Sequence, residues 1–185
     1  MLDLKPTKGR LLIAEPSILN DRSFNRSVVL ITEHSSISGS IGFIMNKPMK
    51  YKVSDLVPEI DCDFTIYKGG PVSQENLYFI HTVPDLIPES IEITKGIYWG
   101  GNFNSVTKLL VDKVISTKDI RFFLGYSGWS ENQLSEELTE DSWLVIENSY
   151  SNILTTNSSI WKNKLMELGG DYQIWANAPK NPALN

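Results

Sequence analysis

The chain has 185 residues, of which 41% are hydrophobic and 21% are charged, and its net charge is −5. A chain of this length and composition can bury a substantial core, so we expect one domain over residues 1–185. The acidic balance disfavours nucleic acid as a partner, because nonspecific binding to phosphates draws its affinity from clustered Lys and Arg.

Basic residues gather at one place in the sequence, where Arg22 and Arg26 precede Lys47, Lys50 and Lys52. Two interpretations are open: a solvated surface, which we favour because the group is small, or a site for a phosphate group. The sequence contains neither a G-x-x-x-x-G-K-[ST] loop nor a G-x-G-x-x-G fingerprint. A standard nucleotide-binding loop is therefore excluded.

Cysteine and histidine usage limits the chemistry further. The single cysteine, Cys62, has no partner for an intramolecular disulfide, and His34 and His81 are not closely paired with it in the sequence. Zinc sites use close pairs of such ligands, so we expect no metal and no cofactor. The N-terminus lacks a long apolar segment, and no apolar run approaches the roughly 20 residues of a membrane helix. These features predict a cytoplasmic protein that does not span a membrane.

The first half of the chain is predicted to be mainly β-structure. Residues 10–14 form an apolar strand that ends at Glu15-Pro16, and residues 17–27 form a polar loop with a helical turn. A β-hairpin follows, and its end is assigned to Pro48, because proline cannot donate to a sheet ladder. The hairpin strands are residues 27–34 and 41–46; after one helical turn at residues 53–57, further strands are residues 64–67, 77–81, 90–94 and 96–99.

The second half adds helices to these strands. An i, i+3, i+4, i+7 apolar stripe predicts a helix over residues 102–113, with Asn102 or Asn104 as its cap. A strand at residues 121–124 precedes a helix whose S-x-x-Q spacing, Ser130 to Gln133, is that of a capping box. Its glutamates are expected on a solvated face. A strand over residues 142–146 and a helix from Ser158 or Ser159 to Gly169 complete an α+β chain with a mixed sheet, and the tail packs its first half.

Two stretches have the form Tyr-x-Gly-Gly, at residues 67–70 and 98–101. Glycine pairs after a strand permit positive φ or a close backbone approach, which serves a bulge, a turn or a ligand contact. Turn chemistry is the favoured interpretation, since glycine most often serves turns.

The stretch from Arg121 to Gln133, RFFLGYSGWSENQ, is predicted to be a strand, a tight turn and a helix start. Its Gly125-Tyr126-Ser127-Gly128-Trp129 core resembles the nucleophile elbow G-x-S-x-G, but Trp129 stands where the last glycine is needed. Both histidines also precede Ser127, so a nucleophilic role for this serine is disfavoured. A helix N-terminus that could hold an anion remains as a hypothesis.

The histidines and tryptophans also allow two interpretations each. His34, beside Glu33 at the hairpin turn, is either a general base or, as we favour, a polar loop residue. His81, at the end of an apolar strand, is predicted to be a hydrogen-bonded core or edge residue. The five tryptophans are scattered along the sequence, which favours packing over a stacking surface for bases.

Taken together, these motifs resemble the YqgE/AlgH family of bacterial proteins. The resemblance runs through Gly9 to Ala14, Phe24 with Arg26 to Ile31, Glu33-His34, and Gly42 to Pro48. It continues through Gly69 to Val72, Leu77 to His81, Trp99 to Gly101, Arg121 to Leu134, and Trp143-Leu144. This order of motifs covers most of the chain.

The resemblance implies an α+β fold with a bifurcated, partly barrel-like sheet wrapped by helices. Some members carry the label of transcriptional regulator, and most have no assigned activity. We expect a non-catalytic binding or regulatory domain for a small molecule or a protein, with an enzyme acting on a phosphorylated or acyl substrate, or a transcriptional regulator, as alternatives. The candidate ligand-binding residues are Arg26, His34, Asn46, Gly69, Gly70, Gly125, Ser127 and Gly128.

Overall fold

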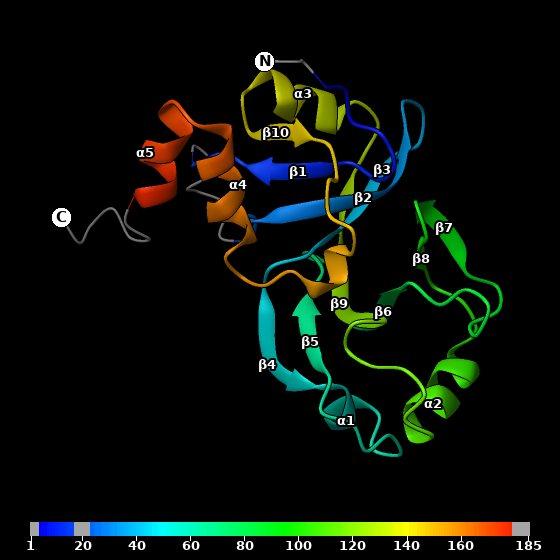
Figure 1. Cartoon of the computed structure of the whole chain (residues 1–185). Helices are drawn as coiled ribbons and strands as arrows, with labels where there is room; N and C mark the ends of the chain where they lie inside the picture. Colours follow the sequence, from blue (N-terminus) through cyan, green and yellow to red (C-terminus); the bar gives the residue numbers. More distant parts are fainter. Residues whose placement is uncertain (1–3, 17–22, 179–185) are drawn as a thin grey trace.

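The structure is a computed structural model that describes residues 4–16 and 23–178. Among these residues a forked sheet has the order β10-β1-β2-β3-β9-β6-β8-β7, and β5 branches from β9 and carries β4 (Figure 1). The strands are β1 (Leu11–Ala14), β2 (Val28–Ser35), β3 (Gly39–Ile44), β4 (Pro48–Lys52), β5 (Thr65–Lys68), β6 (Val72–His81), β7 (Ile91–Thr94), β8 (Ile97–Trp99), β9 (Ile120–Trp129) and β10 (Trp143–Ile146). The helices are α1 (Val53–Leu56), α2 (Phe103–Val111), α3 (Gln133–Thr139), the 3₁₀ turn η2 (Ile153–Thr155), α4 (Ile160–Leu168) and α5 (Asp171–Asn177).

Strands β1 and β2 are buried on both faces, which explains why they are continuous apolar runs in the sequence. Leu11 and Ile13 point into a core that also contains Trp161 of α4. Helices α4 and α5 cover this core. Leu12 and Ala14 point into a second core beneath α3. Figure 1 shows α3 above this part of the sheet and α4 and α5 on its flank. A third core, in the lower half of that view, packs Val106 and Leu110 of α2 against the sheet.

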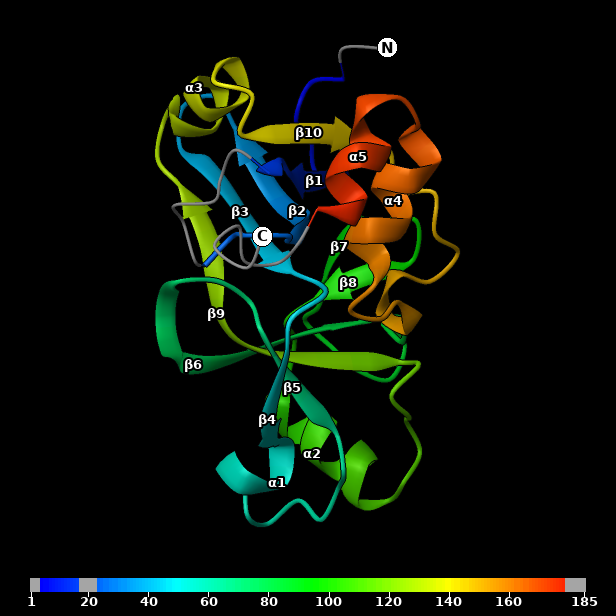
Figure 2. The same cartoon turned by 90° about the vertical axis from the view of Figure 1, so that its left-hand side faces the viewer.

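The long strand β9 joins the two halves of the molecule (Figure 2). Along one edge it pairs with β6 from Ile120 to Tyr126. Along its other edge it pairs first with β5, in parallel, and then with β3, antiparallel, from Ser127 onward. The sheet therefore forks beside Gly125, whose φ of 68° lets the strand change course.

These observations confirm the predicted α+β class with a mixed sheet, and the sheet is bifurcated and not closed. The predicted hairpin, the helix capped by Asn102, and the strand after Glu140 are also present, with boundaries that differ by one or two residues. The loop predicted at residues 17–27 lies mostly outside the described residues.

The prediction of a turn at Gly125 to Trp129 is wrong, because β9 continues through this stretch to Trp129. Positive φ at Gly125 bends the strand without ending it, since β6 and then β3 continue to pair with it. Helix α3 begins only at Gln133, after Asn132 in a left-handed conformation. The side chain of Gln133 accepts the Ser130 N–H at 3.0 Å, as a capping-box glutamine would.

Three further details concern these elements. The hairpin ends before Pro48, at Ile44, but the proline then begins a strand that was not predicted, β4. The tail after Gly170, for which no helix was predicted, forms α5. Glu137 is not on a solvated face: its carboxylate accepts the indole N–H groups of Trp129 and Trp143 at 2.8 and 2.7 Å. That carboxylate ties α3 to the sheet beneath it.

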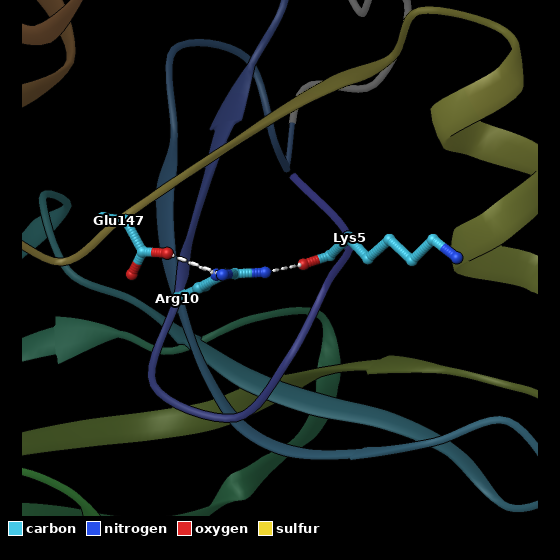
Figure 3. A network of polar contacts seen from close by, with 3 residues as sticks. All are labelled: Lys5, Arg10 and Glu147. Carbon is cyan, nitrogen blue, oxygen red and sulfur yellow. Dashed lines mark hydrogen bonds and ion pairs between the residues drawn. The ribbon is translucent and has the colours of Figure 1, made fainter. Parts of the chain in front are cut away.

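Arg10 connects the N-terminal segment to the chain after β10 (Figure 3). Its guanidinium donates to the Glu147 carboxylate at 2.6 and 2.9 Å and to the Lys5 carbonyl at 2.6 Å. None of the helices in the described part of the chain is both long and apolar enough to cross a membrane.

Candidate functional site

The structure divides the eight candidate residues among three places. Gly69, Gly70, Gly125 and Ser127 meet at the fork of the sheet, and Gly128 follows them in β9. Arg26 and Asn46 line a cleft of about 550 Å³ beside the start of α4. His34 lies apart from both groups, on the β2–β3 hairpin. The set is therefore not one site.

The fork is filled by backbone. A Cβ on Gly69 would lie 2.1 Å from the Gly125 carbonyl oxygen, and one on Gly70 would lie 2.2 Å from the Tyr126 carbonyl. The Gly69 carbonyl accepts the Ile44 N–H at 2.9 Å and the Ser127 hydroxyl at 3.0 Å. Because Ser127 is fully buried and its hydroxyl is already engaged, the geometry assigns these residues to the close crossing of two chain segments.

His34 and His81 have different surroundings. The Nδ1 atom of His34 lies 2.8 Å from the Ser40 hydroxyl, and both line a small cavity of about 60 Å³. His81 is fully buried, with Nε2 3.2 Å from the Gly100 carbonyl and Nδ1 accepting the Val83 N–H at 3.3 Å. Burial lowers the pKa of His81, partly offset by its bond to Gly100. The prediction that His81 is a hydrogen-bonded core residue is confirmed.

A buried arginine, Arg121, stands beside a groove of about 400 Å³ in the lower half of the molecule. Its guanidinium donates to the carbonyls of Met45, Leu154 and Thr156 and stacks over Tyr67, with 4.1 Å to the ring centroid. Desolvation lowers its pKa, with Tyr67 acting in the opposite direction. These bonds connect β9 to η2. We therefore assign Arg121 a structural role and not a ligand-binding one.

The cleft at Arg26 is built from segments far apart in the sequence. The turn before β2 supplies Asn25 and Arg26, the β3–β4 connection supplies Asn46 and Lys47, and the start of α4 supplies the rest. The residues that line it there are Ser158 and Ser159, just before α4, and Trp161 and Lys162 in its first turn. The sequence pointed to Arg26 and Lys47 as part of a thin basic cluster. It gave no signal for Lys162, because only the fold brings that residue to the same place.

Asn46 holds the Arg26 turn in position. Its side chain is buried, accepts the Val28 N–H at 2.9 Å and donates to the Arg26 carbonyl at 2.8 Å. Arg26 has a φ of 57°, a left-handed conformation that is uncommon for a residue with a side chain. One Asn46 bond goes to the carbonyl of this strained residue and the other to the N–H two residues later, so together they hold the turn from which the Arg26 side chain extends.

The walls of the cleft are also fixed. The Trp161 indole donates to the Ala14 carbonyl at 2.8 Å, which locks its ring against β1. The Arg26 guanidinium stands 5.1 Å from that ring and donates one bond, to the Ala178 carbonyl at 2.7 Å. Lys47 donates to the Ser23 carbonyl at 2.7 Å, and Lys162 is exposed.

The described side chains that line the cleft carry positive charge only. Among the described lining residues three are cationic, namely Arg26, Lys47 and Lys162, and none is acidic. No side chain caps the N-terminus of α4, so N–H groups of its first turn remain near the cleft. Cations together with a helix N-terminus are suited to phosphate or carboxylate groups, and the Trp161 ring offers an apolar surface beside them.

Comparison with known proteins places this architecture in a family. Residues 11–173 match a family model described as AlgH-like. A UPF0301 protein of Chlorobium phaeobacteroides is 42% identical over 98% of this chain and 97% of its own length. A UPF0301 protein of Bacteroides thetaiotaomicron is 39% identical over 97% of this chain and 92% of its own length.

Solved structures agree at the level of the fold. The AlgH protein from Pseudomonas aeruginosa superimposes with a TM-score of 0.72 at 21% identity, covering 97% of this chain and 98% of that one. A protein from Corynebacterium diphtheriae superimposes with a TM-score of 0.75 at 21% identity, covering 96% and 95% of the two chains. The chain belongs to the AlgH-like family.

Proposed function

We propose that this protein is a cytoplasmic, non-catalytic binding domain whose cleft at Arg26, Lys47 and Lys162 takes a small anionic molecule. The observation that carries the proposal is the composition of the cleft: three cations and an aromatic ring, with no acidic side chain among the described lining residues. A volume of about 550 Å³ is within the range of small-molecule sites, which is roughly 300–1,000 Å³.

The ligand class follows from the donors. Arg26 presents a planar guanidinium that is suited to two oxygens of one phosphate or carboxylate. Lys47 and Lys162 supply point charges from other elements, and the first turn of α4 adds backbone N–H groups. Because these groups converge from three elements, they favour a compact polyanion, such as a molecule with a phosphate or diphosphate group.

A regulatory role would follow from the position of the cleft. Trp161 belongs to α4, and Arg26 donates to the residue directly after α5. An anion that draws the Arg26 side chain toward it would change this contact. Binding would thereby be transmitted to α4 and α5, the helices that cover one face of the β1–β2 sheet.

The test uses pyrophosphate as the probe and NMR spectra of the full chain labelled with ¹⁵N. We expect saturable shifts of the Trp161 indole N–H and of the Lys162 and Arg26 amides. Lys162→Gln should weaken binding about tenfold, since a hydrogen bond to a charged group contributes about 1.5–3 kcal/mol. The matched control is Lys108→Gln, an exposed lysine on α2, which should bind as the unmodified chain does.

Two outcomes contradict this proposal. One is the absence of saturable shifts at the cleft up to high probe concentrations. The other is equal weakening by Lys162→Gln and Lys108→Gln, which would mean that the probe responds to net charge and not to the cleft. Adding salt separates these effects, because attraction by the whole protein is screened more strongly than a contact in the cleft.

A further inference from the structure

Another cavity, of about 360 Å³, lies on a different part of the surface, along β10. Its walls come from the N-terminal segment, from the turn between α3 and β10, and from α5. The described residues that line it include two carboxylates, Glu15 and Asp141, and two aromatic residues, Trp143 and Tyr172. Its chemistry is thus opposite to that of the Arg26 cleft.

Glu15 is the unusual member of this cavity. It directly follows β1, where its N–H donates to the Ser142 carbonyl at 3.0 Å, so its backbone is fixed. The residue is 7% exposed, yet in the described part of the chain its carboxylate makes no hydrogen bond and no ion pair. A carboxylate buried without a partner is costly, because the desolvation of its charge is not compensated.

The groups around Glu15 do not relieve this cost. Asp141, from the α3–β10 turn, adds a second negative charge, and Tyr172, at the start of α5, brings a hydroxyl with Asp171 beside it. Lys5, on the N-terminal segment, lines the cavity but forms no ion pair with Glu15. Burial, and then Asp141, raise the pKa of Glu15 from 4.5 to about 7.

The missing partner has the properties of a small organic cation. A cation in the cavity would meet the Glu15 carboxylate beside two aromatic side chains, Trp143 and Tyr172, and aromatic rings attract ammonium groups. The Trp143 ring is held in place by its bond to Glu137, so this wall is preorganised. A divalent metal is a poorer match, because among the described residues no three carboxylate, histidine or cysteine side chains gather.

We propose that the cavity at Glu15, Asp141, Trp143 and Tyr172 binds a small primary amine in its ammonium form. This site is independent of the anion cleft, and the two proposals stand or fall separately. Because the cation favours ionised Glu15, binding should release a proton near neutral pH and become tighter as the pH rises.

The test titrates the full chain with ethylammonium chloride at pH 8 and follows the amides of Glu15, Trp143 and Tyr172 by NMR. We expect saturable shifts at these residues, with at least a tenfold loss of affinity in Glu15→Gln. Glu75→Gln, an exposed glutamate on β6, is the matched control and should bind as the unmodified chain does. Pyrophosphate should leave these three amides unchanged.

Further readouts keep the proposal open to refutation if Glu15→Gln does not fold. Asp141→Asn should then weaken binding, and the unmodified chain should bind ethylammonium at least threefold more tightly at pH 8 than at pH 6. Equal affinity at the two pH values would overturn the proposal. So would the absence of saturable shifts, unchanged binding by a folded Glu15→Gln, or shifts of the same amides by magnesium chloride and not by ethylammonium.

Discussion

The fork of the sheet and the Arg26 cleft both contain residues that the sequence singles out, but their polar atoms are occupied differently. At the fork, the carbonyl of Gly69 is already bonded to Ile44 and Ser127, and no space remains for a methyl group. In the cleft, the Arg26 guanidinium donates one hydrogen bond within the described part of the chain and faces an open volume lined by other cations. The glycine-rich motifs mark close backbone packing here, whereas the binding site that we propose is built from charged side chains dispersed in the sequence.

The largest expected effect belongs to Gly70→Ala. The added Cβ would lie 2.2 Å from the Tyr126 carbonyl and 2.3 Å from the Ser127 nitrogen, and backbone atoms in a paired strand cannot move aside cheaply. We expect the free energy of unfolding in urea to fall by about 4 kcal/mol or more.

The control for this variant lies in β9 itself. At Gly128 the added Cβ would meet only side-chain atoms, the Tyr126 ring at 3.1 Å and a Val72 methyl group at 3.6 Å, so Gly128→Ala should cost about 1 kcal/mol or less. Equal costs at the two positions would contradict the assignment of Gly70 to a close backbone crossing.

Arg121→Met should have the next largest effect, because it removes the clasp between β9 and η2. Three carbonyls would lose their donor, and we expect the free energy of unfolding to fall by about 3 kcal/mol. Amide hydrogen exchange should rise most at residues 153–156. If exchange there stays unchanged, Arg121 does not hold η2 in place.

Asn46→Ala should change both the stability of the fold and the binding of an anion in the Arg26 cleft. It leaves the Val28 N–H and the Arg26 carbonyl without partners, for an expected loss of about 2 kcal/mol in urea unfolding. Pyrophosphate binding should weaken as well, because the Arg26 turn loses its support. Asn104→Ala, at an exposed position on α2, is the control and should change neither quantity.

Glu15 gives a smaller effect that depends on pH. Its pKa is raised from 4.5 to about 7, so the folded chain holds a proton that the unfolded chain releases between these values. Stability should therefore fall as the pH rises through this range and should level off above it. Urea unfolding at several pH values measures the slope, which Glu15→Gln should reduce. An unchanged slope would mean that another group titrates.

Much of the fold could be predicted from the sequence, because its signals are local. Strands β1 and β2 are apolar runs, and Asn102 caps α2 as its residue type suggests. The missed elements lack such signals: β4 is largely exposed and begins with a proline, and α5 has seven residues. At Gly125 to Trp129 the glycines are typical of a turn, but pairing with β6 and β3 overrides that local preference.

The candidate sites were harder to predict, because they depend on distant contacts. Arg26 and Lys47 were visible as a basic cluster, but Lys162 meets them only through the packing of Trp161 against β1. Glu15 appeared in the sequence only as the end of a strand. Its importance comes from burial without a bonding partner among the described residues, which no local pattern reports.

The most direct test of the difference between fork and cleft compares two variants in pyrophosphate binding, measured by NMR titration. Gly128→Ala alters the glycine motif and should bind pyrophosphate as tightly as the unmodified chain. Arg26→Gln alters the cleft and should raise the dissociation constant about tenfold, through the loss of a charged hydrogen bond. The reverse result, weak binding by Gly128→Ala and unchanged binding by Arg26→Gln, would contradict the assignment of the binding site to the cleft.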